Sequence, residues 1–105
     1  MKDYILALTT CPESRCEQLA RTLVEKKLCA CVNIISGVKS IYFWKDEITM
    51  DSESILLIKT ETKLSKKLRN IIIENHPYDL PEFITINIDS GSKEYLDWIT
   101  ANLLE

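Results

Sequence analysis

The chain has 105 residues, of which 46% are hydrophobic and 28% charged, with a formal net charge of −3. This length and composition fit one water-soluble domain over residues 1–105, with a core large enough to fold. A net negative charge with scattered lysines argues against nucleic-acid binding, and the absence of any run of roughly 18 apolar residues argues against a membrane protein.

The N-terminal quarter predicts a strand followed by a helix. Residues 4–10 read YILALTT, which is a β-rich run. Pro12 and Glu13 suit the first turn of a helix, which we expect to extend to about Lys27. Apolar side chains then recur at i, i+3, i+4, i+7 and i+8, the spacing of one buried helical face. They are Cys16, Leu19, Ala20, Leu23 and Val24.

The next segment predicts two long antiparallel strands joined by a tight turn. The second strand is expected over residues 29–44, with Gly37 inside it, and the third over residues 48–60. The turn between them falls at Lys45 and Asp46. A strand of this length exceeds the usual five or six residues, so its tip must project beyond the helix layer.

Two prolines, four residues apart, separate the last elements. A second helix is predicted over residues 64–75, and the first proline stops it near His76, the only histidine of the chain. After the second proline, residues 82–89 alternate as a fourth strand. Ser92 is the expected N-cap of a final helix. That helix carries Tyr95, Trp98, Ile99, Asn102 and Leu103 at helical spacing.

The order β-α-β-β-α-β with a C-terminal helix indicates an α+β, ferredoxin-like split βαβ fold. Right-handed crossovers place both long helices on one face of an antiparallel sheet. The other face should be polar if water covers it, yet residues 55–58 are apolar on both sides. Tyr42 and Trp44, on one face of the projecting hairpin, add to this apolar surface. Covering the two rings would contribute about 8–12 kcal/mol per subunit before association costs, enough to hold an oligomer.

Three motifs resemble those of the CutA family of divalent-cation-tolerance proteins. Residues 30–33 read A-C-V-N, residues 40–48 read S-I-Y-F-W-K-D-E-I, and residues 76–82 read H-P-Y-D-L-P-E. They are similar to the family patterns A-C-V-N, S-x-Y-x-W-x-G-x-I and H-P-Y-x-x-P-E, in the same order and across essentially the whole chain. The resemblance implies a PII-like homotrimer, in which the extended hairpins pair with sheets of neighbouring subunits.

Within that homotrimer, the resemblance implies that Tyr42, Phe43 and Trp44 lie in the trimer interface. It also implies that Tyr78 and Glu82 line the cleft between adjacent subunits. An equally good role for these last two residues is to lock the turn from helix to strand. The chain departs from the family pattern at Asp46, where glycine is usual, but aspartate tolerates positive φ better than most residues.

The resemblance further implies a site for divalent cations, copper foremost. Family members implicated in copper binding often carry two consecutive histidines before Pro-Tyr and a cysteine at the end of the first strand. Here Asn75 precedes His76, and Thr9 stands at the cysteine position, while a thiol follows at Cys11. His76 and Cys11 are therefore the candidate metal ligands.

Residue type and position alone favour a structural role over metal binding for both His76 and Cys11. A histidine that ends a helix can cap it by bonding backbone carbonyls. Cys11 precedes a helix N-terminus, which would stabilise a thiolate, but a small residue that fills the turn is the simpler interpretation. Cys29 and Cys31 are expected to pack in the sheet interior. With no signal peptide expected, we predict free thiols and a cytoplasmic protein.

Three classes of function remain open. The first is a trimeric, metal-binding tolerance protein, and the second is a PII-like ligand-sensing or protein-anchoring adaptor trimer. The third is an enzyme on the same fold, such as an acylphosphatase, which is disfavoured because phosphate binding needs a glycine-rich loop and a positioned arginine. The carboxylates of Asp51 and Glu53 suggest only solvated turns. The prediction is therefore a non-enzymatic homotrimer that binds divalent metal ions.

Overall fold

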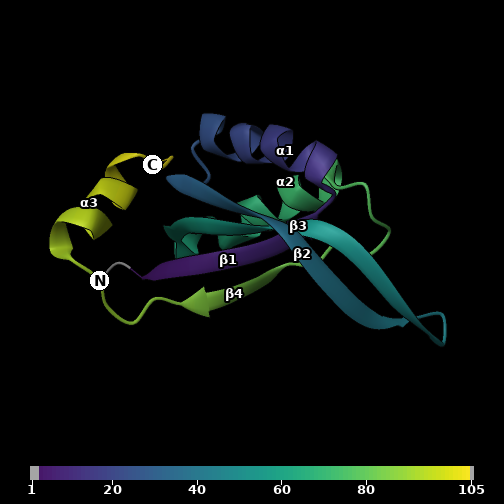
Figure 1. The fold of residues 1–105 in the computed structure, drawn as a ribbon. Coiled ribbons are helices and arrows are strands. Elements are labelled where there is room, and N and C mark those ends of the chain that lie inside the picture. The colour runs from purple at the N-terminus through teal and green to yellow at the C-terminus, as the bar shows by residue number, and fades with distance from the viewer. Residues whose placement is uncertain (1–2, 105) are drawn as a thin grey trace.

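A computed structural model describes residues 3–104 and confirms the predicted ferredoxin-like order of elements. The sheet has four strands in the order β2-β3-β1-β4, and every neighbouring pair is antiparallel. The helices α1 and α2 lie on the same face of this sheet, and α3 lies at one end of it (Figure 1). The elements are β1 (Tyr4–Cys11), α1 (Glu13–Glu25), β2 (Cys31–Trp44), β3 (Glu47–Glu61), the 3-10 turn η1 (Thr62–Leu64), α2 (Ser65–Asn75), β4 (Ile84–Asn87) and α3 (Lys93–Ala101).

The main core lies between the sheet and the two long helices. Strand alternation turns Leu56 and Ile58 toward the helices, where both are completely buried. From α1, the predicted apolar face is confirmed for four of its five members, Cys16, Leu19, Ala20 and Leu23. The fifth, Val24, was predicted to face inward and is instead 41% exposed. It lies at the edge of the apolar stripe, next to the end of the helix.

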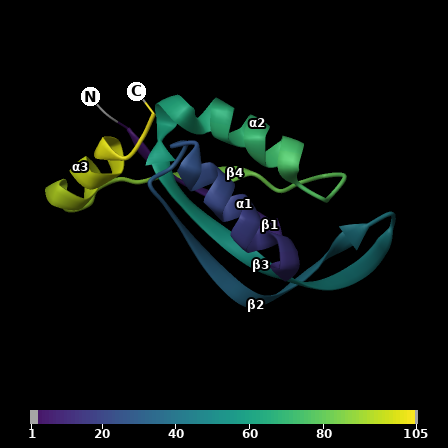
Figure 2. The same ribbon diagram turned by 90° about the horizontal axis from the view of Figure 1, so that it is seen from above.

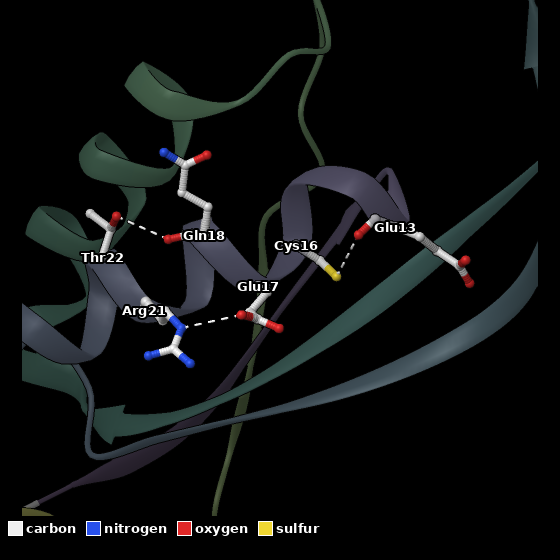
Figure 3. Close-up of polar contacts among 6 residues, drawn as sticks. All are labelled: Glu13, Cys16, Glu17, Gln18, Arg21 and Thr22. Carbon is white, nitrogen blue, oxygen red and sulfur yellow. Dashed lines mark hydrogen bonds and ion pairs between the residues drawn. The ribbon is translucent and has the colours of Figure 1, made fainter.

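The remaining face of α1 is polar and stabilised locally (Figure 3). On this face Arg21 donates to Glu17 at 3.3 Å, a pairing one helical turn apart. On the buried face, the Cys16 thiol donates to the Glu13 carbonyl at 3.2 Å. The Glu13 carboxylate also accepts a 2.8 Å hydrogen bond from the backbone N–H of Gly37. The first turn of α1 is therefore tied to the middle of β2.

The β2–β3 hairpin projects well beyond the helices, as its length predicts (Figure 2). Its turn falls at Lys45 and Asp46, as expected, and both residues have positive φ, 52° and 65°. The register shifts by one residue between Ile35 and Val38, which marks a β-bulge. Gly37 supplies the positive φ of 73° that this bulge requires.

One face of the hairpin carries four apolar side chains, which we call the apolar strip: Ile41, Phe43, Ile48 and Met50. They form two cross-strand pairs, Ile41 with Met50 and Phe43 with Ile48. Each is between 62% and 75% exposed. The sheet face away from α1 and α2 is also apolar, since Ile84 and Ile86 are 50% and 53% exposed. The predicted second apolar face is therefore confirmed.

The structure corrects two predicted strand boundaries. β4 spans four residues rather than residues 82–89, because its ladder with β1 pairs only Ile5 to Leu8. β2 begins at Cys31, and Cys29 precedes it in the link from α1. Cys29 is buried as predicted, but Cys31 is only half-buried, since it lies on the sheet face that the long helices leave open.

The last helix begins as the sequence predicts, with the Ser92 hydroxyl accepting a hydrogen bond from the Tyr95 N–H at 3.3 Å. α3 is anchored by the buried carboxylate of Glu61, to which Thr100 donates at 2.7 Å. None of the helices within residues 3–104 is both long and apolar enough to cross a membrane.

Candidate functional site

A cavity of about 720 Å³ lies between the β2–β3 hairpin and the proline-rich segment that follows α2. We call it the hairpin cavity. It brings together residues that are distant in sequence, because β3 runs from the hairpin back through the sheet beside β1. Its walls include Tyr42, Trp44, Asp51, Glu53, Tyr78 and Glu82.

His76 lies at the point where the proline-rich segment leaves α2. Its backbone is extended, with φ −91° and ψ 138°, as expected for a residue that precedes proline. Nε2 lies 2.6 Å from the carbonyl oxygen of Thr10, and Nδ1 accepts from the backbone N–H of Tyr78 at 3.2 Å. A carbonyl can only accept and an N–H can only donate, so this network assigns the neutral tautomer with the proton on Nε2.

Both nitrogens of His76 are therefore engaged by backbone groups. The lone pair of Nδ1 receives a proton donor, and Nε2 carries the proton that it donates. In this arrangement neither nitrogen is free to bind a metal ion. The histidine bonds a backbone carbonyl, as the plainer interpretation expects, but the carbonyl belongs to β1 and not to its own helix.

Tyr78 connects the same segment to β3. Its hydroxyl donates to Oε1 of Glu53 at 2.9 Å. Burial, followed by this bond to the carboxylate, raises the pKa of Tyr78 well above its usual range, so the phenol stays protonated at neutral pH. Glu53 was expected in a solvated turn and is instead 5% exposed in the middle of a strand. That prediction was wrong because the hairpin register carries Glu53 back under the proline-rich segment.

A second tyrosine–carboxylate pair lies nearer the hairpin tip. The Tyr42 hydroxyl donates to the Asp51 carboxylate across the two strands. This hydrogen bond raises the pKa of Tyr42, which also remains a donor at neutral pH. Trp44 shares the face of Tyr42, as predicted, and Glu82 is exposed at the cavity wall.

Cys11 lies at the end of β1, next to the Thr10 carbonyl that His76 contacts. The thiol is fully buried within the core cluster that also contains Leu56 and Leu68. Burial, followed by the proximity of Cys16, raises the pKa of Cys11 to about 11. The thiol is therefore protonated at neutral pH, and the stabilisation expected from the helix N-terminus does not prevail over burial. Thr9, at the position of the family's cysteine, is also completely buried.

The structure places His76 against the carbonyl of Thr10, the residue that directly precedes Cys11. The two candidate ligands nevertheless do not form a preformed metal site. Within residues 3–104, no group of three or more His, Cys, Asp or Glu side chains lies close enough together to hold a metal ion. The residues that sequence reasoning missed are Thr10 and Glu53. No local signal marks them, because their partners are 66 and 25 residues away along the chain.

Comparisons with known proteins agree with the fold and with the sequence motifs. Residues 5–102 match the model of the family described as CutA1 divalent ion tolerance protein. A protein of Thermus thermophilus named divalent-cation tolerance protein CutA is 41% identical over 100 residues, which cover 95% of this chain and 97% of that protein.

Solved structures give the same result. The crystal structure of CutA1 from Oryza sativa has a TM-score of 0.96 and 36% identity, covering 98% of this chain and 95% of that one. A structure of a protein from Nostoc, described as the PII-like protein CutA in apo form, has a TM-score of 0.89 and 40% identity, covering 99% and 98% of the two chains.

Proposed function

Because this chain belongs to the CutA1 divalent ion tolerance protein family, whose members are not enzymes, we propose that it acts as a homotrimer in the response to divalent metal ions, copper foremost. Family membership supports the role in cation tolerance. The observation that carries the homotrimer is the apolar strip on the projecting hairpin. A cytoplasmic location is part of the same proposal.

The apolar strip is difficult to reconcile with a solitary chain in water. Burying the exposed parts of its four side chains on a neighbour would contribute about 4–8 kcal/mol per subunit, before association costs. The exposed isoleucines Ile84 and Ile86 on the open sheet face offer a matching apolar surface. We therefore propose that the hairpin of each subunit covers the sheet of the next. Tyr42, Phe43 and Trp44 would then lie where neighbours meet, with Tyr78 and Glu82 in the cleft between them.

For the metal, His76 and Cys11 remain the predicted ligands, and their surroundings set the conditions for binding. Ligation by His76 would break its bond to either the Tyr78 N–H or the Thr10 carbonyl, at a cost of about 1–3 kcal/mol. Ligation by Cys11 would also require the buried thiol to lose its proton. We therefore expect Cu(II) to bind more weakly here than at a preformed site.

Calorimetric titration of Cu(II) into the wild type, His76→Gln and Cys11→Ser tests the ligands. The glutamine variant is chosen because its amide nitrogen can reach the Thr10 carbonyl as Nε2 does, while it is a poor copper ligand. Loss of binding in His76→Gln would support the proposal. Unchanged affinity in both variants would show that copper binds elsewhere.

The second candidate function is a PII-like ligand-sensing or protein-anchoring trimer with no physiological metal. The observation that favours it is the hairpin cavity, whose volume of about 720 Å³ falls in the range of small-molecule sites, about 300–1,000 Å³. Wild-type protein that binds no copper in the titration would favour this function over metal tolerance.

A further inference from the structure

We infer that the β2–β3 hairpin has a hinge at its β-bulge, and that the Glu13 carboxylate fixes the angle of this hinge by bonding the backbone N–H of Gly37. The angle sets the width of the hairpin cavity, because the hairpin and the proline-rich segment form its two walls. The inference goes beyond the proposed function, since it requires neither copper nor the candidate ligands His76 and Cys11.

Both strands of the hairpin change their pairing at the same level. On β2, two residues, Ser36 and Gly37, lie opposite a single residue of β3, Ser54. Ser54 also pairs with Cys11, where the ladder between β3 and β1 ends. Beyond this level β2 and β3 pair only with each other, and the hairpin projects past the helices (Figure 2). A change in the backbone angles of a few residues therefore turns the hairpin as one unit.

The residues at this level permit such a change. Gly37 has a positive φ of 73°, and a β-carbon placed on it would have no atom within 4 Å, so the backbone has room to move. On β3, the Ser54 hydroxyl is buried and has no hydrogen-bond partner among the described residues. A buried hydroxyl without a partner costs free energy. The base of the hairpin is therefore held less firmly than the rest of the sheet.

Polar contacts hold the hairpin to the rest of the molecule only at its base. Beyond the bulge, the side-chain hydrogen bond of residues 38–52 is internal and joins Tyr42 to Asp51. No hydrogen bond or ion pair found within residues 3–104 joins residues 38–52 to the helices or to the proline-rich segment. At the base, Glu13 bonds the N–H of Gly37 on β2 at 2.8 Å, and the Tyr78 hydroxyl bonds Glu53 on β3 at 2.9 Å.

Of these two contacts, the one made by Glu13 is the one that can open. A bulge leaves its extra residue outside the ladder, and Gly37 has no partner in the register of β2 with β3. The Glu13 side chain extends from the first turn of α1 (Figure 3) and accepts this N–H at an exposed position, where water can replace it. Glu53 is 5% exposed, so the contact with Tyr78 stays closed and serves as the fixed side of the hinge.

Two measurements on Glu13→Ala test the inference, each made on the full chain at a concentration where light scattering gives the same oligomeric state as the wild type. Amide hydrogen exchange reports the bulge, and exchange at Gly37 should become about two- to tenfold faster when one hydrogen bond is lost. Acrylamide quenching of Trp44, which lines the cavity, reports the angle of the hairpin and should increase. Trp98→Phe is present in all samples, because Trp98 is the second tryptophan of the chain.

Two further variants separate the contact with Gly37 from other effects of the substitution. Glu13→Gln keeps an oxygen acceptor at the same place, so it should restore most of the protection of Gly37 and most of the shielding of Trp44. Glu17→Ala is the control, because Glu17 is an exposed glutamate of the same helix whose partner, Arg21, also lies on α1. It should change neither measurement.

Faster exchange at Gly37 with unchanged quenching of Trp44 would overturn the hinge, because Glu13 would then hold the bulge alone and not the hairpin. Unchanged exchange at Gly37 in Glu13→Ala would overturn the role of Glu13. Equal effects of Glu13→Ala and Glu17→Ala would also overturn it, since the cause would then be a general loss of charge from α1. None of these results affects the proposed function, which is tested separately with copper.

Discussion

His76 holds the segment after α2 against the end of β1 through both of its ring nitrogens. The carbonyl of Thr10 receives the Nε2 proton, and Nδ1 receives the N–H of Tyr78. The ring also lies beside that of Tyr78, with 4.8 Å between centroids. Because Tyr78 in turn bonds the buried carboxylate of Glu53, the position of one wall of the hairpin cavity depends on His76.

Replacing His76 by alanine should therefore lower the free energy of unfolding by about 1–3 kcal/mol, since two backbone groups lose their partner. His76→Gln should keep the bond to Thr10, and His76→Asn the bond to Tyr78, because their amide atoms lie near Nε2 and Nδ1. Each should recover part of the loss. Urea unfolding followed by circular dichroism provides the measurement.

The control for this series is Glu74→Ala, an exposed position in the last turn of α2. It should change stability by less than about 0.5 kcal/mol. If His76→Ala were as stable as this control, His76 would not stabilise the contact between the proline-rich segment and the end of β1.

Single residues were predictable where the sequence itself is unusual. His76 stands out as the only histidine, placed before a proline, and Asp46 stands out at a turn position usually taken by glycine. The roles of Thr10 and Glu53 were not predictable. Each depends on a contact with the proline-rich segment that exists only once strands and helix are in register.

At the level of elements, the end of α1 has the bonding pattern of a Schellman motif. The Lys27 N–H donates to the Val24 carbonyl at 2.9 Å, and the Leu28 N–H donates to the Leu23 carbonyl at 3.1 Å. Lys27, which directly follows the C-cap Lys26, has a positive φ of 58°. Glycine usually occupies this position, because a β-carbon is unfavourable there.

Lys27→Gly should consequently stabilise the protein, by about 0.5–1 kcal/mol, because it relieves the positive φ. The matched control is its neighbour Lys26, whose φ of −79° is helical. Lys26→Gly should have the opposite effect and lower the free energy of unfolding by about 0.5–1 kcal/mol. Thermal unfolding of the two variants beside the wild type measures both effects. A destabilised Lys27→Gly would contradict the role assigned to this helix end.

The order of elements and the length of the hairpin followed from the sequence, because periodicity and turn residues are local signals. The turn at Lys45 and Asp46 is one such case, and the N-cap at Ser92 is another. The ends of β4 could not be predicted from local signals. Residues 82–89 alternate along their whole length, but the ladder with β1 covers only Ile84–Asn87, followed by a single hydrogen bond from the Ile88 N–H to the Tyr4 carbonyl at 2.9 Å.

The shape of the whole molecule reflects the projecting hairpin. The radius of gyration is 14.4 Å, whereas a compact domain of this length would have about 13 Å. The longest dimension, 44 Å, is nearly twice the other two, 25 and 22 Å. The sheet leaves Ile84 and Ile86 half-exposed, and the hairpin extends the apolar strip into solvent. Such surfaces mark interfaces between proteins.

Light scattering coupled to size-exclusion chromatography tests the central claim, which is that copies of this chain cover these apolar surfaces. We predict a species of three chains, about 36 kDa, for a chain of 12.1 kDa. Substituting Phe43 and Ile48 together by serine should shift it toward the monomer, while Ile73→Ser, on α2 and 49% exposed, should not. A folded wild-type monomer at micromolar concentration would contradict the claim.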